Sequence, residues 1–244
     1  MSTETMWTLL PASAAAFLLA LLSAVAGFGG GVLLLPVFTA LFGLRAAVPV
    51  LTLTQLASNG SRLWLNRRDV RWPLVGWFAA GAVPFAVAGA LLLSHAPLSP
   101  LKRLLGVFLV AVVAWRRLNP HPGRPRDRTF AGVGAASGLS SALLGSAGPL
   151  TAPFFLAYGL TRAAYIGTEA TAALSLHLAK LAAYGAGNLL SHRILLYGAA
   201  LTPATVAGAW TGRRIVGRLH DRAFVLLVEA GLIAAGLLFL TGVA

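Results

Sequence analysis

Long apolar runs alternate with short polar segments along the whole chain. A helix needs about 20 residues to cross the hydrocarbon core of a bilayer, and most of the runs reach that length. Because they are continuous and do not alternate with polar residues, they predict helices and not the strands of a membrane barrel. The ten apolar segments are 7–27, 31–43, 46–66, 72–94, 99–115, 129–145, 149–160, 163–190, 194–212 and 223–243.

Segments 31–43 and 149–160 are too short to span, and each follows a break rich in small residues. The first break lies in AGFGGGVLLLPVF, and the second precedes Pro153. When Pro36 is set against Pro153, GGGVLLLPVF aligns with SAGPLTAPFF. Three further correspondences follow at later positions: Arg45-Ala46-Ala47 with Arg162-Ala163-Ala164, Pro84 with Pro203, and Gly89 with Gly208.

These correspondences predict an all-α, polytopic helical bundle made of two repeats in one transmembrane domain, 1–244. The first repeat covers 7–117, the second covers 129–243, and a cytoplasmic linker, 118–128, joins them. Each repeat is expected to hold a broken or re-entrant helix pair and three spanning helices. Glycine-proline breaks at matching positions of two repeats are typical of the binding site of a secondary transporter.

The distribution of basic residues favours an inverted arrangement of the repeats. If the repeats are inverted, 13 arginines lie on one side and 4 basic residues on the other, with Arg62 and Lys180 left aside inside segments. If they are parallel, the count is 9 against 8. Since positive residues accumulate on the cytoplasmic side, we expect inversion, with both termini periplasmic.

Composition agrees with a membrane protein and excludes several other classes. The chain is 58% hydrophobic and 10% charged, whereas a soluble domain carries about 25% charged residues. The net charge of +13 comes mostly from arginines in the short segments between apolar runs, so nucleic acid is not an expected partner. The absence of cysteine excludes thiolate metal sites, and six acidic residues are few for a hard-cation site.

Enzymatic motifs are not found. GFGGG does not match the dinucleotide fingerprint GxGxxG, and the chain has no HExxH or GxSxG. The sequence therefore predicts a protein that is not an enzyme and that has no cofactor and no metal. MSTETMW contains no basic residue, so the first apolar segment is expected to stay in the protein and not to be cleaved as a signal peptide.

The two breaks are the first candidates for a binding site. Helix N-termini carry unpaired N–H groups and a partial positive charge, so the segments that start after the breaks could hold an anion. The alternative is that small residues only let helices pack closely, as expected for Gly76, Gly81 and Gly89. The candidate residues at the breaks are Gly29, Gly30, Gly31, Ser146, Ala147 and Gly148.

Polar residues inside the third segment of each repeat are the second group of candidates. Charges at mid-membrane cost at least about 2.5–3.5 kcal/mol each, so they are expected to face the interior. We expect Lys180 and Arg62 to supply charge, and Gln55, Asn59, Thr171 and Ser175 to orient the anion through hydrogen bonds.

Alternatives stay open for several of these residues. Arg62 could instead extend to the cytoplasmic surface, and His177 could be a buried structural histidine. Glu169 could accept a proton during transport or pair with Arg162. Glu229 has no obvious partner.

Over nearly its full length, the chain resembles the sulfite exporter TauE/SafE family of bacterial inner-membrane permeases. The resemblance rests on GFGGGVLLLP and GSAGPLTAP and on the polar segment after each copy. It departs from the family at SAGP, where a denser glycine run is common, and at Gln55 and Asn59, where hydroxyl residues are more usual. The resemblance implies a multi-pass inner-membrane carrier that exports small sulfur-containing anions such as sulfite or organosulfonates.

We therefore expect a secondary transporter that works by alternating access, with a small anion bound between the two breaks and the lipid bilayer around it. A passive anion channel and a non-transporting membrane subunit are the alternatives. Several points stay open: the exact substrate, the direction of transport, and whether protons are the coupling ion, through Glu169 or His177. It is also open whether the protein forms a homodimer and whether segments 31–43 and 149–160 span the membrane or re-enter it.

Overall fold

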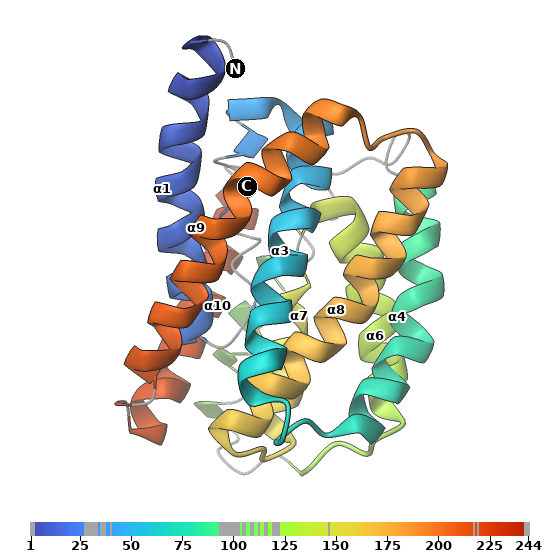
Figure 1. Ribbon diagram of the computed structural model, residues 1–244. Helices are drawn as coiled ribbons and strands as arrows, with labels where there is room; N and C mark the ends of the chain where they lie inside the picture. Colours follow the sequence, from blue (N-terminus) through green and yellow to red (C-terminus); the bar gives the residue numbers. More distant parts are fainter. Residues whose placement is uncertain are drawn as a thin grey trace.

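The chain folds into a bundle of helices in the computed structural model (Figure 1). The described residues contain eight helices and no strand, which confirms the predicted all-helical fold. They are residues 3–26, 34, 38–39, 41–92, 103, 106–107, 110–111, 113–114, 117–118, 123–145, 147–216, 218 and 220–241. The helices are α1 (Thr3–Ala26), α3 (Leu44–Asn66), α4 (Trp72–Leu92), α6 (Thr129–Leu144), α7 (Gly148–Ala157), α8 (Arg162–Ala186), α9 (His192–Val216) and α10 (Asp221–Thr241). Most of segments 31–43 and 99–115 lies outside the described residues.

The helix ends follow local sequence signals. Gly145 ends α6 with φ 74°, a left-handed conformation that glycine adopts without the steric cost of a Cβ. Pro149 lies in the first turn of α7, where its missing N–H breaks no helical hydrogen bond. The Thr161 hydroxyl accepts from the Ala164 amide at 3.4 Å and caps α8.

Six helices, α1, α3 and α4 of the first half and α6, α8 and α9 of the second, pack in a pattern that stays the same when the two halves are exchanged. The first helix of each half packs on the fourth helix of the other half, α1 on α9 and α6 on α4. The third helices, α3 and α8, pack on each other, and each also packs on the fourth helix of the other half. This matched set of contacts is the arrangement expected of two related halves that share one core.

Glycines let the first and fourth helices approach closely. A Cβ on Gly134 of α6 would lie 2.1 Å from the Phe78 carbonyl oxygen of α4, and one on Gly208 of α9 would lie 2.2 Å from the Phe17 carbonyl oxygen of α1. Gly81 and Gly89 also face α6, as the packing interpretation predicts. The expectation for Gly76 is wrong, because an added Cβ there meets no described atom within 4 Å.

Helices α3 and α8, which contain the third segments of the two predicted repeats, run in opposite directions where they meet. The Arg71 amide, just after α3, donates to Thr168 Oγ1 near the start of α8 at 3.0 Å. Leu51, in the first part of α3, shares an apolar cluster with Tyr184 near the end of α8. α3 and α8 are therefore antiparallel, and Figure 1 shows α3 descending beside the ascending α8.

Helices α6 and α7 form a hairpin that returns to the end from which it started. The Tyr158 hydroxyl, just after α7, donates to Asp127 Oδ1 at 2.8 Å, and Asp127 lies just before α6. The rings of Phe130 and Phe155 are 4.8 Å apart between the same two helices. The ten residues of α7 are about 15 Å long, roughly half of a 30 Å hydrocarbon core, so α7 does not cross it.

Arginines gather at one end of the bundle, the lower end in Figure 1, which we call the arginine-rich end. It holds the C-terminal ends of α3 and α9 and the N-terminal ends of α4, α6, α8 and α10. Exposed tryptophans, among them Trp64, Trp72 and Trp210, lie near these helix ends, as is typical of a membrane interface. Its described arginines are Arg67, Arg68, Arg71, Arg117, Arg124, Arg126, Arg128, Arg162, Arg213, Arg214, Arg218 and Arg222.

Two helices in the described part of the chain pass a length and hydropathy test for membrane spans, at Trp72–Leu92 and His192–Ile215. Helix α8 is long enough, but it carries Glu169, His177 and Lys180, which lower its mean hydropathy. All three side chains are buried in the bundle.

Candidate functional site in the polar seam between α3 and α8

The contact between α3 and α8 is lined by buried polar side chains, which we call the polar seam. Hydrocarbon cannot solvate such groups, so each helix turns its polar face toward the other. The members of the seam that sequence analysis selected are Gln55, Asn59 and Arg62 on α3, and Glu169, His177 and Lys180 on α8.

Near the arginine-rich end, the seam contains an ion pair between the two halves. Arg62 Nη2 lies 2.8 Å from Glu169 Oε2, and both side chains are 2% exposed. Arg62 Nη1 also donates to Asn59 Oδ1 at 3.0 Å. Arg62 therefore does not extend to the surface, and Glu169 has a partner that sequence analysis did not identify.

Lys180 is fully buried at the other end of the seam, where it contacts the end of α6. Its Nζ donates to the Ser141 carbonyl oxygen at 2.9 Å and to Ser141 Oγ at 3.1 Å. The Tyr184 hydroxyl donates to the Ala142 carbonyl oxygen at 3.2 Å. The last four carbonyls of a helix have no partner within the helix, so Lys180 and Tyr184 together satisfy two of those that α6 exposes at its break.

The ammonium group of Lys180 has no counter-ion among the described residues. Ion pairs in that part of the chain join Arg62 to Glu169 and Arg117 to Glu229. An ammonium group has three N–H donors, and Ser141 accepts from Lys180 at two atoms. One donor is thus left at the break between α6 and α7, where the partial negative charge of the α6 C-terminus favours the ammonium form of Lys180.

Arg62 and Lys180 do not converge on one point. Lys180 lies eleven residues beyond Glu169, which is about 16 Å along the axis of α8. The buried Asn59 Nδ2 and His177 Nδ1 have no hydrogen-bond partner within the described structure. Both residues lie between the two cations along the seam, so unused polar atoms occupy its middle.

The predicted hydroxyl ligands are committed to their own helix. Thr171 Oγ1 donates to the Gly167 carbonyl at 2.7 Å, and Ser175 Oγ donates to the Ala172 carbonyl at 2.6 Å. A hydroxyl has a single hydrogen, so either residue would have to give up this bond to donate to an anion.

At the second break, the backbone offers few donors. Pro149 has no N–H, and the Leu150 and Thr151 amides both donate to the Ala147 carbonyl. The donors that this helix end can present to a ligand are therefore the amides of Ala147 and Gly148, both buried. Gly29, Gly30, Gly31 and Ser146 lie outside the described residues.

Two further contacts of charged or polar groups were not predicted. Ser141 accepts hydrogen bonds from Lys180 at its carbonyl oxygen and its hydroxyl, but its position in an apolar run does not indicate this role. Glu229 accepts from Arg117 Nη2 at 2.9 Å and from Arg117 Nε at 3.2 Å. The sequence contains one hint of this pair, because Arg117 directly follows segment 99–115 and Glu229 lies in segment 223–243, the last apolar segments of the two predicted repeats.

The family model for the sulfite exporter TauE/SafE matches residues 12–239, nearly the whole chain. The chain belongs to the TauE/SafE family. This confirms the resemblance inferred from the duplicated glycine-proline element. A TauE/SafE protein is a membrane transporter of small anions, which agrees with the apolar helices and with the buried cation at the break. Searches of curated proteins and of solved structures gave no match.

Proposed function

We propose that this TauE/SafE protein is a secondary transporter that exports small sulfur-containing anions such as sulfite or organosulfonates. The observation that carries the proposal is Lys180, which is fully buried and lacks a counter-ion among the described residues. A buried charge without a partner is unfavourable in a membrane interior, and a bound anion would supply the missing negative charge. The third Lys180 donor would bind one oxygen of that anion.

The donors around Lys180 complete the proposed site. Gly148 and Ala147 supply backbone amides at the second break, and glycines 29–31 of the first break would supply the opposite wall. Gln55 and Asn59 reach the middle of the seam from α3, and the unused Asn59 Nδ2 is a donor suited to an anion. Arg62 is already neutralised by Glu169, so we assign it to positioning Asn59 through their hydrogen bond.

We also propose that the halves are inverted repeats and that the arginine-rich end is cytoplasmic. The antiparallel contact of α3 with α8 supports inversion, and the positive-inside rule supports the orientation. The α6–α7 hairpin would then re-enter from the cytoplasm, and the termini of α1 and α10 would lie on the periplasmic side. Rocking of one half against the other would expose the break alternately to the two sides.

Proton coupling would involve Glu169 or His177, the two titratable seam residues next to a cation. Glu169 contacts Arg62 directly, so its protonation would break the ion pair between the halves. His177 lies one turn from Lys180 on α8 and has an unused Nδ1 within the described structure. Either residue could therefore link a proton to movement of the halves.

Flux into proteoliposomes tests the proposal. Vesicles with an imposed proton gradient should accumulate sulfite against its own gradient with the natural protein, and Lys180→Met should abolish this accumulation. Flux that is downhill and insensitive to the gradient would instead identify a passive channel. A protein that neither transports nor binds any of sulfite, thiosulfate, sulfonates and carboxylates would be a non-transporting subunit.

A further inference from the structure

Helices α3 and α9 meet closely near their N-terminal ends and separate toward the arginine-rich end (Figure 1). A Cβ on Gly198 of α9 would lie 2.5 Å from Leu53 Cδ1 of α3, so the two helices touch there. Eight residues further along each helix, Ser61 and Val206 line a groove between them. Pro203 lies in α9 between the contact and the groove, and a proline inside a helix bends it.

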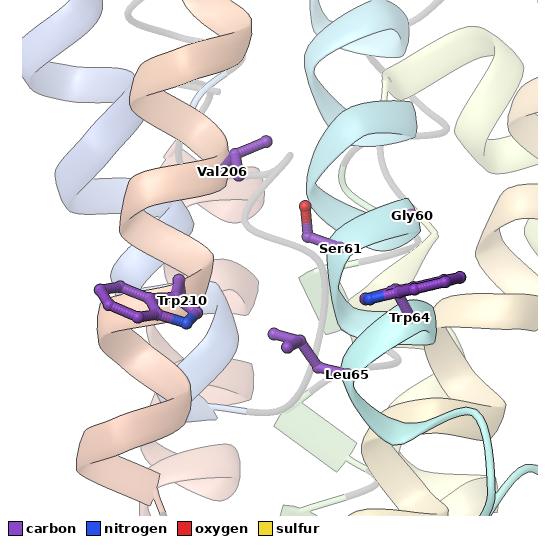
Figure 2. Close-up of a pocket in the computed structure, with 6 residues that line it drawn as sticks. All are labelled: Gly60, Ser61, Trp64, Leu65, Val206 and Trp210. Carbon is purple, nitrogen blue, oxygen red and sulfur yellow. The ribbon is translucent and has the colours of Figure 1, made fainter.

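The groove has a volume of about 380 Å³, within the range of small-molecule sites. Figure 2 shows Ser61 and Leu65 of α3 facing Val206 of α9 across it, and the rings of Trp64 and Trp210, which also line the groove, extend away from each other in this view. The Ser61 hydroxyl donates to the Ala57 carbonyl within α3 at 2.9 Å. The lining therefore presents an almost wholly apolar surface.

This groove lies on the opposite face of α3 from the polar seam. Successive residues of a helix are 100° apart, which places Gly60 and Trp64 on the side away from Asn59 and Arg62. Trp64 and Trp210 are exposed on the outside of the bundle. Because the chain belongs to a family of membrane transporters, a groove on this exposed outer face would be open to the acyl chains of the bilayer.

Two arginines lie next to tryptophans that line the groove. The Arg67 guanidinium lies 4.2 Å from the centre of the Trp64 ring and donates from Nη1 to the Trp64 carbonyl oxygen at 3.2 Å, and the Arg214 guanidinium lies 3.6 Å from the centre of the Trp210 ring. Neither arginine forms an ion pair with a carboxylate in the described part of the chain. Each guanidinium is therefore positioned by its tryptophan and has donors available for an oxyanion.

We propose that this groove binds an anionic phospholipid, with an acyl chain between α3 and α9 and the phosphate between Arg67 and Arg214. The apolar lining matches the chain, and the two stacked guanidiniums match the charged headgroup. Basic pockets between helices on the cytoplasmic side of membrane proteins bind anionic headgroups in the same manner. A zwitterionic lipid such as phosphatidylcholine would bind in the groove with lower affinity, because two arginines would repel its choline cation.

Native mass spectrometry of the full-length protein tests the assignment. The detergent-purified protein is mixed with equal amounts of phosphatidylglycerol and phosphatidylcholine, and the retained lipids are counted. Lipid binding gains about 1 kcal/mol per basic residue near the surface, so Arg67→Gln with Arg214→Gln should lower the preference for phosphatidylglycerol about thirtyfold. Gly60→Leu fills the groove, where an added Cβ meets no described atom within 4 Å, and should lower retention of both lipids.

The matched control is Arg68→Gln with Arg213→Gln, which removes the same charge from the neighbouring positions. The preference should survive in this control. An equal loss there would overturn the proposal in favour of diffuse surface charge. The proposal would also be overturned if the natural protein showed no preference for phosphatidylglycerol over phosphatidylcholine. It would be overturned as well if the protein were a dimer that Gly60→Leu dissociates without any change in lipid retention, because the groove would then be a dimer interface.

Discussion

The buried ion pair between Arg62 and Glu169 makes a quantitative prediction about stability. Both side chains are 2% exposed, and their charged atoms lie 2.8 Å apart. Removal of one partner from a buried pair leaves an uncompensated charge and destabilises a protein by about 3–5 kcal/mol. Glu169→Gln should therefore destabilise the folded protein by that amount. For a chain of this size, each kcal/mol lowers the unfolding temperature by about 2–4 °C, so the expected drop is about 6–20 °C.

Thermal unfolding in detergent, followed by tryptophan fluorescence, measures this drop. Glu229→Gln is the control, because it removes the same charge from a pair whose arginine, Arg117, is 59% exposed and can be solvated. Exposed pairs contribute about 0–1 kcal/mol, so the control should lose at most about 4 °C. Leucine at both Arg62 and Glu169 should recover part of the stability, since it removes both charges of this pair. Equal, small drops for Glu169→Gln and Glu229→Gln would refute this reasoning.

Two further predictions concern packing and topology. Gly134→Ala should destabilise the protein by about 1–3 kcal/mol, because its Cβ would collide with the Phe78 carbonyl oxygen. The control is Gly132→Ala, whose Cβ meets no described atom within 4 Å and which should be neutral or stabilising. A larger loss of stability for Gly132→Ala than for Gly134→Ala in unfolding measurements would contradict the packing account. Because the chain contains no cysteine, single cysteines can be labelled cleanly in cells. Asp69→Cys should react with a membrane-impermeant reagent only in inside-out vesicles and Ser191→Cys only in intact cells, whereas labelling of both from one side would exclude the proposed topology.

The sequence predicts the helices well because their limits are local properties. Apolar runs end where glycine, proline or arginine interrupts them, as at Gly145 and in the arginine-rich segment that follows Asn66. The repeat is predicted from the similar sequences around Pro36 and Pro153. The regions of the break that carry Gly29 to Gly31 lie outside the described residues, so their role stays a prediction.

The partners of the buried charges could not be predicted, because they depend on how α3 meets α8. Arg62 and Lys180 each lie eighteen residues after the first residue of their helix. Glu169 lies seven residues after the start of α8, and the corresponding residue of α3 is Leu51. The antiparallel contact places the carboxylate of Glu169 beside Arg62, whereas the residue at the matching position of α3, Leu51, carries no charge that could pair with Lys180. This difference follows only from the direction of the two helices.

The contact of Lys180 with α6 likewise requires three-dimensional information. Its partner, Ser141, is 39 residues away in sequence. Sequence alone marks Lys180 as a costly buried charge, but it does not show that the same side chain also caps the helix that ends at the break. Lys180 therefore has a structural role as well as the proposed binding role, and any test of binding must separate the two.

Binding of sulfite to the purified protein, measured by isothermal titration calorimetry, tests the central claim most directly. Lys180→Met removes the cation and one cap of α6, whereas Tyr184→Phe removes the neighbouring cap at Ala142 without any change of charge. A hydrogen bond from a charged group is worth about 1.5–3 kcal/mol, so Lys180→Met should weaken binding at least tenfold, while Tyr184→Phe should stay within about threefold of the natural protein. Unchanged affinity in Lys180→Met, or an equal loss in Tyr184→Phe, would contradict the assignment of Lys180 as the residue that binds the anion.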